Sequence, residues 1–276
     1  MKKGILFFCV SLCMMAGTCS VHAEKVKGNG SIVTKEVQVS EFKGIEFGPG
    51  IEWNDRFFGK KSKNPVFRYS QTEGEAALEI TVDENLYPLL LISSSNGTLS
   101  IGVKEGKRII PSRLEISGHS KTLQNVSVSG CGDFVLMNDL KTDDLAITVS
   151  GAGDVKLDKP VRVERFKVRV SGAGDLKASD LVCEEIESQV SGSGDVTLKG
   201  KAERGVFGVS GAGDMGAFDF IVKELDCSVS GSGDLDVHAT GRLNVSVSGA
   251  GDIRYKGDAP VQLIKKTGAG DIRQVN

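Results

Sequence analysis

The sequence predicts an all-β protein: a parallel β-solenoid with about 20 residues per repeat, preceded by a less regular β region that caps it at the N-terminal end. Three observations predict this fold class. A segment of the form Ser/Thr-Gly-Ala/Ser/Cys-Gly-Asp recurs eight times, apolar and polar residues alternate on both sides of each copy, and aromatic residues make up only 6% of the 276 residues. The core is therefore expected to consist of small and β-branched side chains.

The first 23 residues have the features of a secretory signal peptide. Lys2 and Lys3 precede an apolar run over residues 5–15, and small residues stand at positions 21 and 23, before the expected cleavage site. We therefore expect an exported chain that begins at Glu24 and lies in the periplasm or at the cell surface. Residues 15–19 also resemble a lipobox, but Thr18 fits poorly before an acylated cysteine, so lipid anchoring through Cys19 is the less favoured alternative.

The composition excludes several classes of function. Lys and Arg total 34 against 36 Asp and Glu, which leaves no basic field for binding nucleic acid. After residue 23, no apolar run reaches the roughly 20 residues of a membrane-spanning helix. Three histidines make a histidine-based metal or catalytic centre an unfavoured interpretation. Cys131, Cys183 and Cys227 are expected to be small buried side chains, and one disulfide with a leftover thiol is the alternative.

Residues 24–120 are expected to form the irregular β region. Apolar and polar residues alternate over residues 30–39, 44–53 and 76–83, and Ser95-Asn96-Gly97-Thr98 is typical of a hairpin turn. We interpret this region as a cap or a set of early coils, because an uncovered end coil would expose the core. Residues 24–276 are then expected to be one continuous domain, with the solenoid at 121–276.

A basic and aromatic stretch lies within this region, at residues 54–69. Such a loop can bind an anionic glycan or a protein partner. The predicted contact residues are Trp53, Arg56, Phe57, Phe58, Lys60 and Lys61. The alternative is a hairpin whose aromatic rings pack on the cap and whose lysines are solvated.

Eight repeats fill residues 121–276. Their aspartates are 18 to 21 residues apart, which is enough chain for one coil per repeat, and a coil of two repeats is the alternative. The side chains seven and five residues before the aspartate are mostly apolar, as Val168 and Val170 are before Asp175, and apolar residues recur one and three residues after it. This period of two predicts a strand on each side of the turn, with both apolar faces toward a shared core.

The repeated turn is expected to be structural. Its glycines should allow positive φ and a sharp corner, and its aspartate can accept hydrogen bonds from nearby backbone N–H groups. The predicted turn residues are Gly130, Gly132, Asp133, Gly151, Gly153, Asp154, Gly172, Gly174, Asp175, Gly192, Gly194, Asp195, Gly211, Gly213, Asp214, Gly231, Gly233, Asp234, Gly249, Gly251, Asp252, Gly268, Gly270 and Asp271. Calcium binding in the manner of a β-roll is the alternative, but a β-roll requires the motif about every nine residues.

No catalytic, metal-binding or cofactor-binding residue is predicted. An enzyme needs a singular set of side chains, whereas each aspartate of the turns is one of eight equivalents. The alternative function is a β-helix carbohydrate-active enzyme, a polysaccharide lyase or hydrolase, which would need clustered carboxylates with Lys, Arg or His on one sheet face.

Several segments resemble a known family of Bacteroidetes proteins. Gly-Ile-Glu at 44–46, Thr-Val-Asp-Glu-Asn-Leu at 81–86, Asn-Gly-Thr-Leu-Ser-Ile at 96–101 and the serial Gly-Asp turns are similar to those of the family described as "putative auto-transporter adhesin, head GIN domain". The resemblance implies a right-handed parallel β-helix, an exported or surface location and a role in adhesion. We therefore expect a non-enzymatic adhesin, or a surface or periplasmic binding scaffold, that binds a protein or glycan without a cofactor. The sequence leaves a homo-oligomer open.

Overall fold

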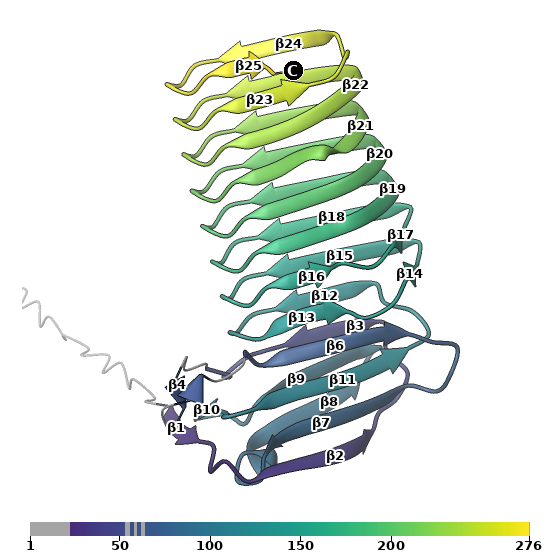
Figure 1. Cartoon of the computed structure of the whole chain (residues 1–276), viewed down its shortest axis with the longest axis vertical. Coiled ribbons are helices and arrows are strands. Elements are labelled where there is room, and N and C mark those ends of the chain that lie inside the picture. Colours follow the sequence, from purple (N-terminus) through teal and green to yellow (C-terminus); the bar gives the residue numbers. More distant parts are fainter. Residues whose placement is uncertain (1–22, 53–55, 58–59, 62–63, 276) are drawn as a thin grey trace, which may run out of the picture.

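The computed structural model describes residues 23–52, 56–57, 60–61 and 64–275, with the side chains of 56–57 and 60–61 left out. The described chain is all-β apart from one short 3-10 helix, η1 (Tyr87–Leu89). From residue 121 onward it winds into a right-handed stack of parallel coils, one repeat to a coil (Figure 1). The predicted fold class is therefore confirmed.

Two parallel sheets form the long sides of the stack. Sheet 1 contains the strand that precedes each turn, and sheet 2 contains the strand that follows it. Sheet 1 consists of β12 (Asn125–Val128), β15 (Asp144–Val149), β18 (Arg165–Val170), the second halves of β19 (Leu176–Val190), β20 (Val196–Val209), β21 (Met215–Val229) and β22 (Leu235–Val247), and β24 (Val261–Lys266). Sheet 2 consists of β13 (Asp133–Leu136), β16 (Val155–Leu157), the first halves of β19 to β22, β23 (Ile253–Lys256) and β25 (Ile272–Gln274).

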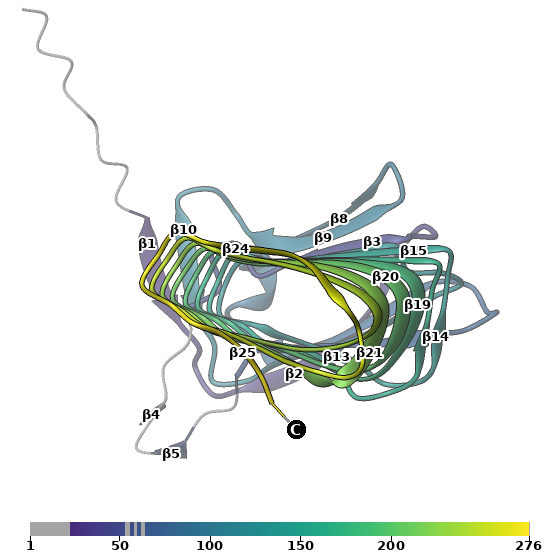
Figure 2. The same ribbon diagram turned by 90° about the horizontal axis from the view of Figure 1, so that it is seen from above.

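The side of the stack opposite the turns, here called the far side, changes along the axis. In the early coils it carries the short strands β14 (Leu140–Lys141) and β17 (Val161–Arg162). In the later coils one long strand bends around it, so that β19 to β22 begin in sheet 2 and end in sheet 1 (Figure 2).

The strand registers show that each coil holds one repeat. Asp144 lies beside Arg165, Leu176 beside Val196, and Leu235 beside Ile253, all in parallel pairs. These pairs join residues 21, 20 and 18 positions apart, which matches the spacing of the aspartates. A coil of two repeats is thereby excluded.

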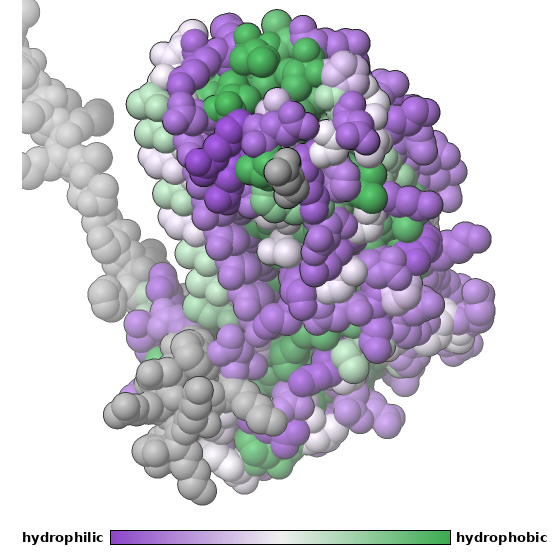
Figure 3. Space-filling model, turned by 45° about the horizontal axis from the view of Figure 1, so that its top comes forward, coloured by the Kyte–Doolittle hydropathy of each residue, from purple (hydrophilic) through white to green (hydrophobic). Residues whose placement is uncertain are grey.

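The core fills the flattened tube between the two sheets. The positions predicted to face inward are buried through the first seven coils, and the buried apolar side chains form one continuous cluster from Phe42 to Ala259. In the last coil, which lacks a neighbour, the inward position Ile264 is 60% exposed. Leu263, which pairs with Asn244 on the outer face, is 56% exposed. Apolar surface accordingly gathers at the C-terminal end of the stack (Figure 3).

The N-terminal region extends both sheets. Beyond β12, sheet 1 continues through β3 (Gly44–Phe47), β9 (Thr98–Val103) and β8 (Leu90–Ser95). Beyond β13, sheet 2 continues through β6 (Val66–Gln71), β11 (Leu114–Ser120), β7 (Ala77–Asp83) and β2 (Ile32–Gln38). A separate pair joins β1 (Glu24–Lys27) to β10 (Lys107–Ile110). Strands β8, β7 and β2 form antiparallel pairs, and the predicted hairpin turn between β8 and β9 is confirmed, with φ of 52° at Asn96 and 74° at Gly97.

The coils of this region are stacked out of sequence order. The coil built from β3 and β6 lies between β12 and β13 on one side and the later segments β9 and β11 on the other. The buried carboxylate of Asp83 helps to hold the arrangement, because it accepts hydrogen bonds from the N–H of Gly30 and the N–H and hydroxyl of Ser112, at 2.6 to 2.8 Å. Sequence reasoning anticipated early coils here but not their order.

The three described cysteines are free. None of them forms a disulfide with another; Cys183 and Cys227 are buried and Cys131 is half-buried. Burial raises the pKa of the Cys183 thiol to about 12, which keeps it protonated at neutral pH. Within the described ranges no helix has the length and hydropathy that a membrane span requires.

Candidate functional site

The predicted turn residues stack into one narrow edge of the solenoid, here called the turn edge. The expectation of positive φ at these glycines is wrong: positive φ occurs at Gly48, Gly97 and five other described glycines, but at none of those in the turns. The reason for glycine is close stacking. A Cβ on Gly172 would overlap the carbonyl oxygen of Gly151 in the preceding coil, and a Cβ on Gly174 would overlap that of Gly153. The equivalent overlap recurs in every later coil.

The turn aspartates form a ladder of hydrogen bonds along this edge. Each carboxylate except that of Asp271, in the last coil, accepts a hydrogen bond from the backbone N–H of the aspartate in the next coil. The seven N···O distances lie between 2.7 and 3.2 Å and run from Asp133 to Asp271. Cations flank both ends, where Lys156 pairs with Asp133 and Asp154, and Arg273 pairs with Asp252. The aspartates thus bind backbone between coils, which is a structural role.

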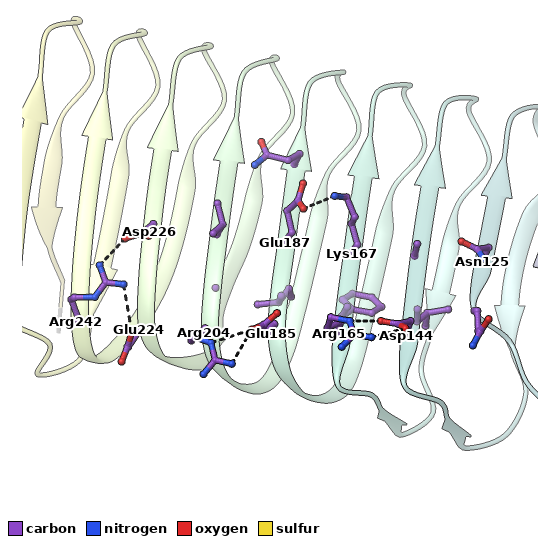
Figure 4. Close-up of a pocket in the computed structure, with 18 residues that line it drawn as sticks. Asn125, Asp144, Arg165, Lys167, Glu185, Glu187, Arg204, Glu224, Asp226 and Arg242 are labelled. Carbon is purple, nitrogen blue, oxygen red and sulfur yellow. Dashed lines mark hydrogen bonds and ion pairs between the residues drawn. The ribbon is translucent and has the colours of Figure 1, made fainter.

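A column of alternating charge runs along the outer face of sheet 1 (Figure 4). It has one residue from each of six consecutive coils, and strand pairing sets these residues side by side. In order along the axis they are Asp144, Arg165, Glu185, Arg204, Glu224 and Arg242. Each lies ten residues before the aspartate of its own turn, as Asp144 does before Asp154. Sequence reasoning missed this column. An alignment of the repeats on the turn aspartate shows the alternating charges at the tenth position before it.

Ion pairs join neighbours in this column. A guanidinium nitrogen of Arg165 lies 2.8 Å from Asp144, and one of Arg204 lies 2.8 Å from Glu185. Arg242 lies 3.5 Å from Glu224 and 3.0 Å from Asp226 of the next column. These hydrogen bonds raise the pKa of Arg165 and of Arg204 above the ordinary arginine value. The face is therefore strongly charged but locally neutral.

A second column lies beside the first, eight residues before each aspartate. It consists of Ala146, Lys167, Glu187, Val206, Asp226 and Asn244. Lys167 donates a hydrogen bond to Glu187 at 2.5 Å, and this bond lowers the pKa of that carboxyl below its ordinary value. Short side chains between long ones leave a shallow groove of about 850 Å³ along both columns, here called the charged groove. Val206 is 47% exposed within it.

The described surface carries no constellation that resembles an enzyme site. Within the described ranges, no group of three or more His, Cys, Asp or Glu side chains is placed to hold a metal ion. The ring of His238 contacts the carbonyl oxygen of Phe218 at 3.3 Å, on the outside of sheet 2 and away from the charged groove. The carboxylates of the charged groove are engaged by lysine or arginine from adjacent strands, so they bind neighbours instead of being poised for proton transfer.

The predicted partner loop falls largely outside the described residues. Trp53 and Phe58 are not described, and Arg56–Phe57 (β4) and Lys60–Lys61 (β5) are described only as an antiparallel backbone pair. Their strands lie beyond the outline of the stacked coils (Figure 2). The insertion occupies residues 48–65, between β3 and β6, where each solenoid coil has its short turn. Gly48 lies directly beneath Gly130 of the first turn, so the insertion leaves the stack at the turn edge.

Comparisons with known proteins point to one family. A family model described as "Putative auto-transporter adhesin, head GIN domain" matches residues 66–179 and 145–259. A search of the curated proteins gives no match. A crystal structure of a putative adhesin from Parabacteroides merdae is 31% identical, with a TM-score of 0.80, and the match covers 92% of this chain and 100% of that one.

Two structures from Parabacteroides distasonis are similar to the same extent. One is a putative adhesin, 31% identical with a TM-score of 0.81, matched over 91% of this chain and 100% of its own. The other is a putative lipid binding protein, 28% identical with a TM-score of 0.81, matched over 92% of this chain and 100% of its own. With more than half of its residues matched by the family model, the chain belongs to the putative auto-transporter adhesin, head GIN domain family.

Proposed function

We propose that this protein is an exported, non-enzymatic adhesin that presents a binding site on a rigid solenoid. The observation that carries the proposal is the make-up of the surface: stacked equivalent columns, with charges paired between coils along sheet 1. Catalysis requires singular, perturbed groups. Adhesion requires an extended, rigid framework, which the continuous core from Phe42 to Ala259 supplies.

The features of residues 1–23 support export, and membership of an adhesin family supports a surface location. Both the soluble form after cleavage and the lipid-anchored form through Cys19 are compatible with adhesion. The division into a signal peptide (1–23), a β cap (24–120) and a solenoid (121–276) forms part of the proposal.

The insertion at residues 48–65 is the proposed contact site. It interrupts the repetition of the turn edge, and its strands β4 and β5 lie beyond the outline of the stacked coils, where a partner can reach them (Figure 2). Its sequence combines the basic side chains of Arg56, Lys60 and Lys61 with aromatic rings at Trp53, Phe57 and Phe58. Cations suit acidic sugars or carboxylates, and rings suit sugar faces and protein hot spots. A protein or an anionic glycan is therefore the proposed partner.

A binding screen tests the proposal. The chain from Glu24 is applied to a glycan array and to immobilised extracellular-matrix proteins, beside a variant in which residues 54–64 are replaced by a short Gly-Ser linker. A matched control replaces only Arg56, Lys60 and Lys61 by glutamine, which keeps the length of the loop. We expect binding by the parent chain, little or none by the linker variant, and weakened binding to acidic ligands by the glutamine variant.

Three results would contradict parts of the proposal. Equal binding by all three chains would place the contact elsewhere on the solenoid. Cleavage of any glycan would favour the carbohydrate-active alternative. Binding to lipid vesicles alone would favour the activity named for the relative from P. distasonis, with the lipid on the outside because the core is filled by buried side chains.

A further inference from the structure

The first column of the charged groove is complementary in charge to the same column read in the opposite direction. From β15 to β22 its charges run acid, base, acid, base, acid, base. Read from the other end, the same column runs base, acid, base, acid, base, acid. A second copy laid face to face with its solenoid axis reversed would therefore set a base against every acid. Asp144 would face the partner's Arg242, Arg165 the partner's Glu224, and Glu185 the partner's Arg204.

The second column of the charged groove also avoids like charges in the reversed arrangement. In the reversed arrangement Lys167 would face the partner's Asp226, and Glu187 would face the partner's Val206. Ala146 would face the partner's Asn244. Neither column then places like charges against each other. A second copy with its axis in the same direction and its coils level would instead place every charge of the first column against its like, which costs binding energy.

We propose that the charged groove is a two-fold dimer interface, and that its occupant is a second copy of this chain with the solenoid axis reversed. The two-fold axis passes between β19 and β20, next to the half-exposed Val206. Such an interface is isologous, because the same patch is used on both copies. Arg165 and Arg204 each keep 56% of their side chain exposed, so donors beyond those of the intrachain pairs remain available to a partner.

The rest of the molecule leaves room for this arrangement. The eight coils of one copy would match the eight coils of the other, with β12 facing the partner's β24 strand. The N-terminal extension of sheet 1, through β3, β9 and β8, then lies past the last coil of the partner. The β8–β9 hairpin leans outward on the sheet 1 side of the stack (Figure 2), and it does so beyond the region of contact.

The expected dimer is weak and sensitive to salt. Six coils at about 4.8 Å, with about five residues of strand at about 3.3 Å each, give a contact on the order of 500 Å² per copy. That area lies at the low end for specific complexes and corresponds to transient association. Because the contacts are charged and near the surface, added salt should weaken them.

The test exchanges the two charges of one ion pair at a time, which keeps that pair, although R242E also loses the contact of Arg242 with Asp226. One variant carries D144R and R165D, and the other carries E224R and R242E. In each, the exchanged residues can still pair within the chain, but in the proposed homodimer they would meet like charges of the partner. Mixed together, the two variants would again be complementary at all four positions. Thermal melting of each variant alone serves as the control for folding.

Sedimentation equilibrium of the chain from Glu24 gives the outcome. We expect the parent chain to self-associate at about 100 µM in about 50 mM NaCl and to dissociate in about 500 mM NaCl. Each variant should self-associate at least about tenfold more weakly, and an equimolar mixture should recover the association. A parent chain that stays monomeric in low salt would overturn the proposal, whether or not the variants fold. So would folded variants that each dimerise like the parent, or a mixture of folded variants that stays monomeric. None of these three results bears on the loop, which the binding screen tests separately.

Discussion

The turn edge and the charged groove stack residues in the same register, yet they follow opposite rules. At the turn edge the same residue recurs in every coil, and eight aspartates of one sign lie in a column. In the groove, neighbouring coils carry opposite signs. The difference shows what each carboxylate has to bind. A turn aspartate accepts a backbone N–H from the next coil, whereas the side chains of the groove stand on strands whose backbone groups are already paired.

Substitution of a turn glycine should cause the largest loss in the free energy of unfolding. Gly172→Ala would press a methyl group against the carbonyl oxygen of Gly151, and neither backbone can move without disturbing the stack. We expect a loss of about 3 kcal/mol or more in the free energy of unfolding, measured in urea. The matched control is Gly216→Ala, on the outer face of β21, where an added Cβ meets nothing within 4 Å. Similar losses in both variants would contradict the stacking explanation.

Removal of one hydrogen bond from the aspartate ladder should cause an intermediate loss in the free energy of unfolding. Asp195→Ala removes the oxygen that accepts the N–H of Asp214 at 2.8 Å, and we expect a cost of about 1 to 2 kcal/mol. Asp195→Asn retains an acceptor oxygen while removing the charge, so it should cost much less. If the asparagine variant were as unstable as the alanine variant, the charge and not the hydrogen bond would stabilise the column.

Removal of a buried polar group behind the charged groove should increase the free energy of unfolding. The hydroxyl of Ser188 is fully buried on the core side of β19 and has no hydrogen-bond partner among the described residues, unlike the turn aspartates. Ser188→Ala should stabilise the fold by about 1 kcal/mol, because an unsatisfied group is removed from the core. Ser246→Ala, on the outer face of β22, is the control and should change little. A destabilised Ser188→Ala variant would show that the hydroxyl has a partner, such as a buried water.

The ion pairs of the charged groove should contribute least to the free energy of unfolding. The hydrogen bond from Lys167 lowers the pKa of Glu187 from its ordinary value of 4.5. Its stabilisation is therefore present above pH 4.5 and is lost as the pH falls through the lowered folded value. For an exposed pair we expect less than about 1 kcal/mol. Urea unfolding at about pH 6 and about pH 3 should show a smaller acid loss in Lys167→Met than in the parent chain. An equal loss in both would mean that the pair does not stabilise the fold.

The sequence was informative wherever one coil repeats the next. The alternation of Val168 and Val170 with polar residues was enough to predict strands with a shared core, because the period of a strand is independent of what it packs against. For the turn glycines, the explanation by positive φ was wrong. Positive φ is a local property, whereas the overlap with the preceding coil depends on residues about 20 positions away.

The N-terminal region shows why non-repeating segments are harder to predict. The hairpin at Asn96 and Gly97 carries its own local signal, and it was predicted. The placement of β3 and β6 between β9 and the first solenoid coil depends on which edges find a complementary partner. That choice is made by long-range contacts, such as those of Asp83 with Gly30 and Ser112, and it leaves no mark at any fixed spacing.

By itself, the sequence determined the all-β class, the length of a coil and the inward faces of its strands, because each of these follows from a period that repeats along the chain. Only the tertiary structure decided the order of the N-terminal coils, the reason for the glycines and the opposite charges along sheet 1. These features arise from contacts between coils. Parallel stacking brings residues 18 to 21 positions apart within a single strand spacing, and at that distance their size and charge determine whether the coils fit together.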